Sequence, residues 1–584
     1  MSSSPSSPGP SGSPVSGAAR LYASAYRPEP GRQGGELVVG DWRSLSSLDP
    51  YAPADPVNAE VLGATTRSLL ALTDDGRWAT ELAAAPIDGA SVTRDKEGTG
   101  FSVRVKLRSG LRWSDGEPLT MDDFAFARSW VLAADQGTVD PRNWQTVDRI
   151  TVADDGLSAS YHFADVTPDW LAVVGLNPPL PEHAMKDLPP SAAASAFPLS
   201  DAAARIPVDG PFRYASAGST GVSLVRNERW VDGGRGAYLD RLTFRAFVDD
   251  KDQLESAIAD GSVDVGLGLT ADDLTVLGRL SPDQAAIDVV PTWRLEHLDL
   301  NASGDGPGSG LPALTDRAVR SAIVGSIDRA GLYAATYPLG GDRVGQACSI
   351  APANSFWIAS GIAAACPTVD ASAAAGALDA AGYERGPDGV RVDPKTGQPL
   401  SLRLCTSDDL AHHTGAQYLA DALAPVGVRV EPLFVDPAAV LFADWGDATA
   451  ATACNLARGT FDAALYSSSL GLDLVSDYFL SLHSSQIPSD ANDGAGFNYV
   501  RYDGNQMDAA LESLRAAVDP ADALAAVDRV QQLAAATDAV VPLYFRPSVG
   551  AIGRRARNVA PTPAAPAGIG SDLWNVEDWW EASG

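Results

Sequence analysis

The chain has 584 residues, of which 45% are hydrophobic and 20% are charged. This length is too great for one ordinary core and indicates roughly two to four folding units. The formal net charge of −31, from 43 basic and 74 acidic residues, argues against a surface that neutralises nucleic-acid phosphates or docks on anionic lipid. We expect the excess carboxylates to keep a secreted protein soluble rather than to store cations.

The four cysteines all lie in the second half of the chain and lack the spacing of a zinc site. An even number in one region favours one or two disulfides in an oxidising compartment, and four buried free thiols in a cytosolic protein are the alternative. The spacing leaves the pairing open. The candidates are Cys348, Cys366, Cys405 and Cys454.

The N-terminal stretch from Ser2 to about Pro30 is rich in Ser, Pro and Gly. Such a composition does not bury enough surface to fold, so we predict a disordered tether over residues 1–34. The chain does not begin with a charged and then an apolar signal region, and it contains no apolar run long enough to span a membrane. In exported lipoproteins a similar tether follows the lipidated cysteine. Met1 would then be a trimmed start, and a native terminus without a leader is the alternative.

The first half of the chain alternates short strands with helices. ELVVG at 36–40 is typical of a strand, and apolar spacing over 59–72 predicts a helix. FSVRVKL at 101–107 alternates strictly, which predicts a second strand. Thr120, followed by two aspartates, is a helix N-cap. The strands expected at 150–152 and 158–163 flank Asp-Asp-Gly, so they form a hairpin.

The second half indicates an α/β lobe with a mixed or parallel sheet. Strands are expected between 207 and 248, followed by a helix over 250–260 that ends at Gly261. Further along, the pattern predicts a helix at 316–334, a strand at 399–405, a helix at 414–425, a strand at 428–434, helices within 505–537 and a strand at 540–545. The tail carries Trp574, Trp579 and Trp580, which we expect to pack onto the body.

No catalytic constellation is evident. The six histidines are scattered, and neither a G-x-S-x-G motif nor a phosphate-binding loop occurs. His412 and His413 are adjacent, so a regular helix or strand cannot direct both at one metal ion, and we expect a solvated pair. The WSDG segment at 113–116 forms a turn before the capped helix. We therefore predict no enzyme activity, no metal site and no cofactor.

Seven segments spread over residues 36 to 580 carry a resemblance to a known family. They are LRSGLRWSDGEPLTMDDFAFA at 107–127, LPEH at 180–183, PVDGPFRY at 207–214 with VRNERW at 225–230, GSVDVG at 261–266, DRAVRSAIVGSIDRAGL at 316–332, GQPLSLRL at 397–404 and VPLY at 541–544. In this order they resemble the family 5 extracellular solute-binding proteins, which are oligopeptide, dipeptide and nickel binders. The resemblance implies a two-lobed periplasmic-binding-protein-like fold of the large type II, with an inserted subdomain.

On this resemblance the chain divides into discontinuous parts. Lobe I would comprise 35–75, 200–265 and 538–584, with the inserted subdomain at 76–199. Lobe II would comprise 266–537 and would contain all four cysteines. A ligand would be trapped in the cleft between the lobes by hinge closure and then delivered to the membrane permease of an ABC importer.

The resemblance also implies ligand-binding residues. A peptide of arbitrary sequence must be held by its backbone and termini, and its ammonium group needs a fixed carboxylate. The family's carboxylate follows a motif resembling W-G-A-D-Y-P-D-P, and the counterpart here begins SLGLD, with Asp473 as the predicted anchor. Leu470 stands where the family often has Trp. Further predicted wall positions are Ser469, Leu470, Gly471, Tyr544, Trp144, and the segment from Ala54 to Val57, which includes Pro56.

We therefore expect an extracytoplasmic, lipid-anchored and monomeric solute-binding protein that captures oligopeptides. The Leu470 departure keeps open an oligosaccharide, a metal chelate or another small solute as ligand in the same fold. A lipoprotein that senses or scaffolds without transport is the alternative from a different class, and it would have a sealed or filled cleft.

Overall fold

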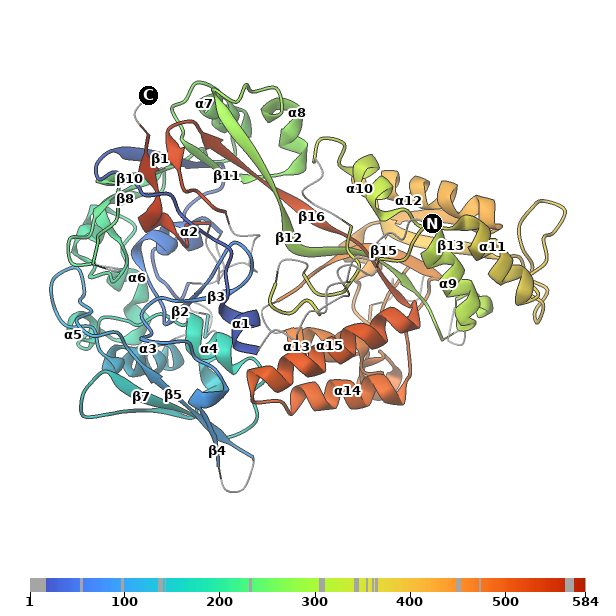
Figure 1. Cartoon of the computed structure of the whole chain (residues 1–584), viewed down its shortest axis with the longest axis horizontal. Coiled ribbons are helices and arrows are strands. Elements are labelled where there is room, and N and C mark those ends of the chain that lie inside the picture. The colour runs from blue at the N-terminus through green and yellow to red at the C-terminus, as the bar shows by residue number, and fades with distance from the viewer. Residues whose placement is uncertain are drawn as a thin grey trace, which may run out of the picture.

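The computed structural model describes residues 17–52, 56–95, 99–134, 140–141, 143–230, 234–303, 310–340, 346–352, 355–359, 362, 366–447, 453–471, 474–561 and 572–582. Two lobes occupy the two ends of the molecule, and two long strands run between them (Figure 1). Among the described helices, none combines the length and apolar character that a membrane span requires.

A mixed sheet of ten strands extends through both lobes in the order β14-β13-β15-β12-β16-β11-β1-β10-β9-β8. In that order the strands are Arg429–Val435, Ser401–Ser407, Ala463–Ser469, Ala285–Leu300, Val540–Gly553, Val265–Leu269, Glu36–Asp41, Arg241–Ala246, Gly221–Arg226 and Phe212–Gly218. β1 is parallel to β10 and β11, and β13 is parallel to β14 and β15. β12 and β16 are antiparallel to each other, so the sheet is mixed, as the alternating pattern predicts.

The two longest strands, β12 and β16, connect the lobes (Figure 1). They pair from Ala285 with Gly553 at one end to Asp299 with Val540 at the other. Their register shifts twice, between Pro291 and Leu295 and between Glu296 and His297, and such irregularities bend and twist a strand locally. The last seven residues of β12 also pair with β15. This segment therefore belongs both to the connection between the lobes and to the sheet of lobe II.

Lobe I contains the β1 side of the sheet with helices α2 (Pro56–Thr65), α7 (Lys251–Ala259) and α8 (Leu274–Leu277). The helix predicted over 59–72 is too long at its C-terminal end. It ends at Thr65, and β2 (Leu70–Leu72) pairs with β3 (Trp78–Thr80) around a turn. The strand pairing therefore overrides the helical spacing of these apolar residues.

The inserted subdomain is built on a separate antiparallel sheet in the order β4-β5-β7-β6. Its strands are Val92–Arg94, Phe101–Lys106, Ser158–Phe163 and Arg149–Val152, and its helices include α3 (Met121–Ala133), α4 (Trp170–Leu176), α5 (Glu182–Met185) and α6 (Ala193–Ala196). The predicted strand and hairpin are confirmed. Thr120 caps α3 in a capping box with Asp123, and Trp113 of the WSDG turn is buried and donates to the same aspartate.

Helices cover both faces of the lobe II sheet. On one face lie α9 (Arg317–Ser326), α10 (Arg329–Thr336), α11 (Ala371–Ala380) and α12 (Leu410–Leu423). On the other lie α13 (Leu474–Leu482), α14 (Asn505–Arg515) and α15 (Pro520–Thr537). The helix predicted over 316–334 is split, because the Asp328 side chain caps α10 by accepting from the Gly331 amide. The Trp170 indole donates to Val518 O at 2.8 Å, so the turn between α14 and α15 also contacts the inserted subdomain.

The N-terminal segment is ordered earlier than the tether predicted over 1–34. Helix α1 (Gly17–Tyr22) packs Leu21 into the main core, where its side chain is 3% exposed. Arg20 forms an ion pair of 2.7 Å with Asp528 on α15 and donates to the carbonyl of Trp357. These apolar and charged contacts outweigh the low-complexity composition of the preceding residues. In the tail, Trp579 is fully buried, as predicted.

Candidate functional site

A cavity of about 330 Å³ lies against one face of the β12–β15 strand pair in lobe II. Its walls come from these two strands, from helix α13 and from the segment 497–500, with Phe442, Ile350 and Val540 at the sides. The residues that line it are Leu295, His297, Asp299, Ile350, Phe442, Tyr466, Ser467, Ser468, Ser469, Leu470, Asp477, Tyr478, Leu480, Ser481, Leu482, Phe497, Tyr499, Val500 and Val540. Polar and apolar residues therefore surround one space.

One edge of strand β15 is open beside this cavity. β12 pairs with β15 as far as Ser469, but β13 pairs with it only from Ala463 to Leu465. Within the described part of the chain, residues 466–469 thus have no strand partner on the β13 side. An open strand edge presents backbone N–H and C=O groups that can pair with another extended chain. The open edge of β15 can therefore pair with an extended chain.

A hydrogen-bonded network of four side chains faces the cavity. His297 bonds to Asp299 through Nδ1 at 2.8 Å and to the Ser468 hydroxyl through Nε2 at 2.9 Å. The Tyr466 hydroxyl donates to the second oxygen of Asp299 at 2.7 Å. With the Nδ1 proton assigned to the bond with Asp299, Nε2 of the neutral ring accepts the Ser468 proton. The lone pairs of the Ser468 oxygen then remain available to a ligand in the cavity.

This order of carboxylate, imidazole and hydroxyl is also the order that activates a serine in hydrolases. Hydrolysis additionally needs donors aimed at the developing oxyanion. The nearby backbone N–H of Leu470 already donates to Trp293 O at 2.9 Å, so this amide is not available as such a donor. The network is therefore best described as a set of ligand-facing hydroxyls held in place by His297.

The opposite face of the same strand pair carries an ion-pair cluster. The fully buried Glu296 accepts from Arg546 at 2.8 Å and bonds to His412 Nε2 at 3.1 Å, and His412 Nδ1 bonds to Asp409. Burial alone would raise the pKa of Glu296, but the bond with His412 and the charge of Arg546 outweigh it, and the pKa is lowered. Burial opposes the charged form of His412, but Glu296 and Asp409 raise its pKa.

Arg294 lies beside this cluster and reaches across β15. Its Nε donates to the Ser467 hydroxyl at 2.9 Å, and its side chain is exposed. Partial burial and the neighbouring Arg546 lower the pKa of Arg294, but a guanidinium remains charged at neutral pH. Among the described residues, no carboxylate forms an ion pair with it. Arg294 is therefore a cation that reaches strand β15 and has capacity to bind an anion.

The predicted residues around Asp473 flank the cavity. Ser469 and Leu470 line it, and the Gly471 amide donates to Asp477 Oδ2 at 2.7 Å just before α13. Asp473 itself lies outside the described residues. Sequence reasoning missed Asp477 as a residue of this wall, although it belongs to the motif segment in which Asp473 was singled out.

The remaining predicted wall positions lie elsewhere. Tyr544 is buried on the Glu296 face, where its ring contacts Tyr333 and Tyr337 edge-on. Trp144 is fully buried in the inserted subdomain and donates to the Tyr51 hydroxyl at 3.1 Å, so it does not line this cavity. Pro56 opens helix α2 in lobe I, and Ala54 lies outside the described residues.

The expected solvated histidine pair is wrong for His412. His412 is 5% exposed and bonded to two carboxylates, whereas the side chain of His413 is 46% exposed and bonded to Asp408. Helix α12 directs adjacent residues to different sides, which fits the argument that the two cannot bind one metal ion. His297 was also missed, because its partner Ser468 lies 171 residues away in the sequence.

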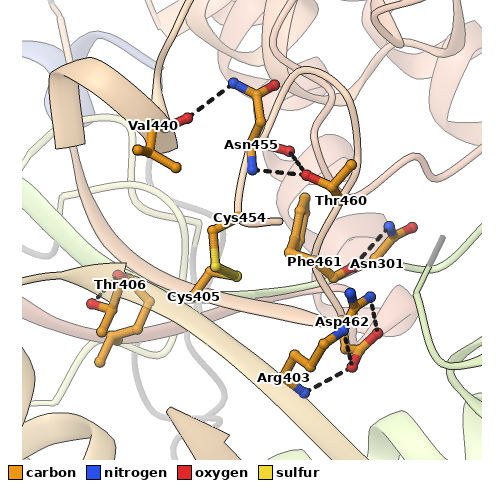
Figure 2. The surroundings of a disulfide bond; sticks show 11 residues. Asn301, Arg403, Cys405, Thr406, Val440, Cys454, Asn455, Thr460, Phe461 and Asp462 are labelled. Atoms are coloured by element: carbon orange, nitrogen blue, oxygen red, sulfur yellow. Dashed lines mark hydrogen bonds and ion pairs between the residues drawn. A yellow bond between two sulfur atoms is a disulfide. The ribbon is translucent and has the colours of Figure 1, made fainter. Parts of the chain in front are cut away.

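Two disulfides supply the pairing that the sequence left open. Cys348 pairs with Cys366, and Cys405 on β13 pairs with Cys454. Figure 2 shows the second bond between the strand and a loop held by Asn455, whose amide donates to Val440 O at 3.0 Å. Asn455 follows Cys454 and also donates to Ala443 O at 2.9 Å, so its two bonds hold the backbone on either side of Phe442, a residue of the cavity wall.

The sequence matches a known protein family and several characterised proteins. A family model described as bacterial extracellular solute-binding proteins, family 5 Middle, matches residues 88–489, more than half of the chain. The oligopeptide-binding protein OppA of Mycobacterium tuberculosis is 28% identical over 461 residues, which cover 78% of this chain and 70% of OppA. The probable monoacyl phosphatidylinositol tetramannoside-binding protein LpqW of the same species is 26% identical over 455 residues, 70% of this chain and 66% of LpqW.

A solved structure agrees with the architecture. The ABC transporter substrate-binding protein CtaP of Listeria monocytogenes has a TM-score of 0.68 at 21% identity, over 94% of this chain and 100% of CtaP. At this identity the likeness bears on the fold and not on the ligand. The predicted two-lobed α/β class is thereby confirmed.

Proposed function

The chain belongs to the bacterial extracellular solute-binding proteins of family 5, and on this premise we propose that it captures oligopeptides for import. Family 5 proteins bind peptides or small solutes outside the cytoplasm and work with ABC permeases. Binding rather than catalysis is the role of the family. The bound peptide would occupy the cleft between the lobes and be released to the permease.

The observation that carries this proposal is the open edge of β15 beside the cavity. Residues 466–469 lack a strand partner on the β13 side within the described part of the chain. An extended peptide can pair with these backbone groups whatever its side chains are. The likeness to OppA, an oligopeptide-binding protein by name, supports the same class of ligand.

Asp473 remains our candidate for the group that binds the peptide ammonium. Its neighbours are placed beside the cavity, since Leu470 lines it and helix α13 begins at Leu474. Ligand contacts made only when the lobes close would then shift the population to the closed state.

The test measures the melting temperature of the purified protein with pooled peptides of two to six residues. Free peptides should raise it, because a ligand at a hundred times its Kd stabilises the folded state by about 2.7 kcal/mol. N-acetylated copies should raise it less if an ammonium anchor exists. Copies with N-methylated backbone amides should fail if strand pairing holds the peptide. Mass spectrometry of the recovered peptide distinguishes binding from hydrolysis.

The outcome that contradicts the proposal is the absence of any shift with free peptides. A shift with oligosaccharides or metal chelates instead would assign the same fold to a different solute. Asp473→Asn gives a further comparison, with Asp447→Asn as a matched surface control. Loss of the difference between free and acetylated peptides in the first variant alone would support the anchor.

A further inference from the structure

The β12–β15 pair presents two chemically different faces at the open edge. Leu295 lies opposite Ser468, and Arg294 lies opposite Ser469. Since side chains alternate along a strand, Leu295, His297 and Ser468 point to one face and Arg294, Glu296 and Ser467 to the other. At the open edge Ser467 and Ser469 also border the cavity. We call these the cavity face and the arginine face. A peptide paired with the open edge would direct successive side chains to the two faces in turn.

The cavity face accepts a large uncharged side chain. The volume of about 330 Å³ is bounded by apolar groups such as Leu470 and Leu482. The Ser468 hydroxyl, which gives its proton to His297 Nε2, also borders this cavity, so its oxygen can accept a hydrogen bond from a polar ligand atom.

The carboxylates that line this cavity already have partners. Asp299 bonds to His297 and Tyr466, and Asp477 accepts from the Gly471 amide. The cavity therefore does not require a cationic side chain to neutralise it. Tyrosine is the residue that best combines a large ring with a polar tip.

The arginine face offers a cation to the neighbouring position. Nε of Arg294 donates to the Ser467 hydroxyl, so the guanidinium of this β12 residue reaches strand β15 on this face. Adjacent strands are about 4.8 Å apart, so a carboxylate on a paired peptide would come within reach. The other charges on this face are already combined, because Glu296 bonds to Arg546 and His412, and His412 bonds to Asp409.

We infer that the site selects peptides in which a large uncharged side chain, tyrosine above all, stands next to a carboxylate. This inference rests on the proposed function and adds a side-chain pattern to it. The carboxylate comes from an Asp or Glu side chain or from the peptide C-terminus. Either chain direction of the peptide gives the same alternation, because both place neighbouring residues on opposite faces.

The experiment compares Kd values, by calorimetry, for matched pentapeptides with a free N-terminus and an amidated C-terminus. The central pair is Tyr-Glu, Tyr-Gln, Tyr-Lys or Gly-Glu in otherwise identical alanine peptides. Tyr-Glu should bind roughly five- to tenfold more tightly than Tyr-Gln, as expected for a partly enclosed ion pair. Tyr-Lys should bind more weakly than Tyr-Gln, and Gly-Glu should lose the contribution of the cavity. A peptide ending in Tyr-Ala with a free carboxylate tests the C-terminal source.

Variants of Arg294 separate the inference from general effects on folding. Arg294→Gln should bring the ratio between the Tyr-Gln and Tyr-Glu Kd values close to one. Arg294→Glu should reverse the preference toward Tyr-Lys, a gain that misfolding cannot produce. Arg149→Gln removes an exposed arginine from the inserted subdomain, where the side chain is 61% exposed, and should leave all Kd values unchanged.

Different results overturn the proposed function and the side-chain pattern. If none of the peptides binds, the proposed function is overturned. If the peptides bind but Glu, Gln and Lys are equivalent next to Tyr, peptide capture stands and the alternation is overturned. If the Glu preference survives in Arg294→Gln, the carboxylate binds elsewhere and the role of Arg294 is overturned.

Discussion

The two faces of one strand pair use the same residue types for different purposes. Adjacent residues of β12, Glu296 and His297, point to opposite faces. On the arginine face, His412 lies between two carboxylates and beside a guanidinium. On the cavity face, His297 bonds to one carboxylate and one hydroxyl, and open space adjoins it. Both histidines thus have an acidic partner, but their roles differ. His412 is a structural group because other charged side chains surround it, whereas His297 faces a ligand because a cavity adjoins it.

The largest expected effect comes from breaking the charge balance of the arginine face. Glu296→Gln keeps the side-chain shape but leaves Arg546 without its buried anion. Removal of one partner of a buried pair costs roughly 3–5 kcal/mol, and calorimetric unfolding should show it. Glu431→Gln on the exposed strand β14 is the matched control and should change stability by less than about 0.5 kcal/mol. A loss as small as the control's would mean that the cluster contributes little to folding.

A smaller loss is expected from the bonded hydroxyl of the cavity face. Tyr466→Phe removes the donor to Asp299 Oδ2, while the ring still packs against His297. A buried acceptor left unsatisfied costs about 1–3 kcal/mol, which thermal unfolding would detect. Phe434→Leu is the control for loss of an aromatic contact without loss of a hydroxyl, because Phe434 stacks on the exposed His413. If Tyr466→Phe were neutral, cavity water would have replaced the hydroxyl.

Local structure was predictable, but the two faces of the β12–β15 pair were not. Strict alternation identified 101–107 as a strand, and Thr120 identified a helix start. Each of these signals is contained in a few consecutive residues. Strand alternation alone directs Glu296 and His297 to opposite faces, but the residues of β15 that join each face depend on the register between β12 and β15, which brings together residues about 170 positions apart. No local pattern contains that register.

The motif segment shows the same limit on the site. A resemblance led to Ser469 and Leu470, and both line the cavity. Tyr544, chosen from the neighbouring motif VPLY, points to the arginine face instead. The register of β16 shifts next to its partners Leu295 and Glu296, so the face of Tyr544 could not be deduced by counting from the motif.

At the N-terminus, the apolar pair Leu21 and Tyr22 was the signal that ordered structure begins before residue 34.

A pH series tests the charges of the arginine face, because the pKa values of Glu296 and His412 are shifted in opposite directions. The pKa of Glu296 is lowered from 4.5, so its stabilising contribution is present above that pH and is lost on acidification through the lowered value. The pKa of His412 is raised from 6.5, so its contribution is present below that pH and is lost as the pH rises through the raised value. Both contributions coexist between pH 4.5 and 6.5.

His412→Gln isolates the second contribution. The difference in melting temperature between wild type and variant should be largest near pH 6 and should narrow toward alkaline pH. The groups around His412 are Glu296, Asp409, Arg294 and Arg546, and the pKa of Asp409 is also lowered, so acidification below its range removes part of the effect too. His413→Gln on the exposed side of α12 should show no such pH dependence. A difference that grows with pH would contradict the assignment.

The smallest effect on the empty protein is expected at Tyr478, and the contrast with Tyr466 makes it informative. Both tyrosines border the cavity, but the Tyr478 hydroxyl has no partner within the described residues. Tyr478→Phe should therefore change unfolding stability by less than about 0.5 kcal/mol or increase it. Tyr466→Phe, which removes a bonded hydroxyl, should by contrast lower the melting temperature of the empty protein. A large loss of stability in Tyr478→Phe would show that its hydroxyl is already bonded in the empty protein.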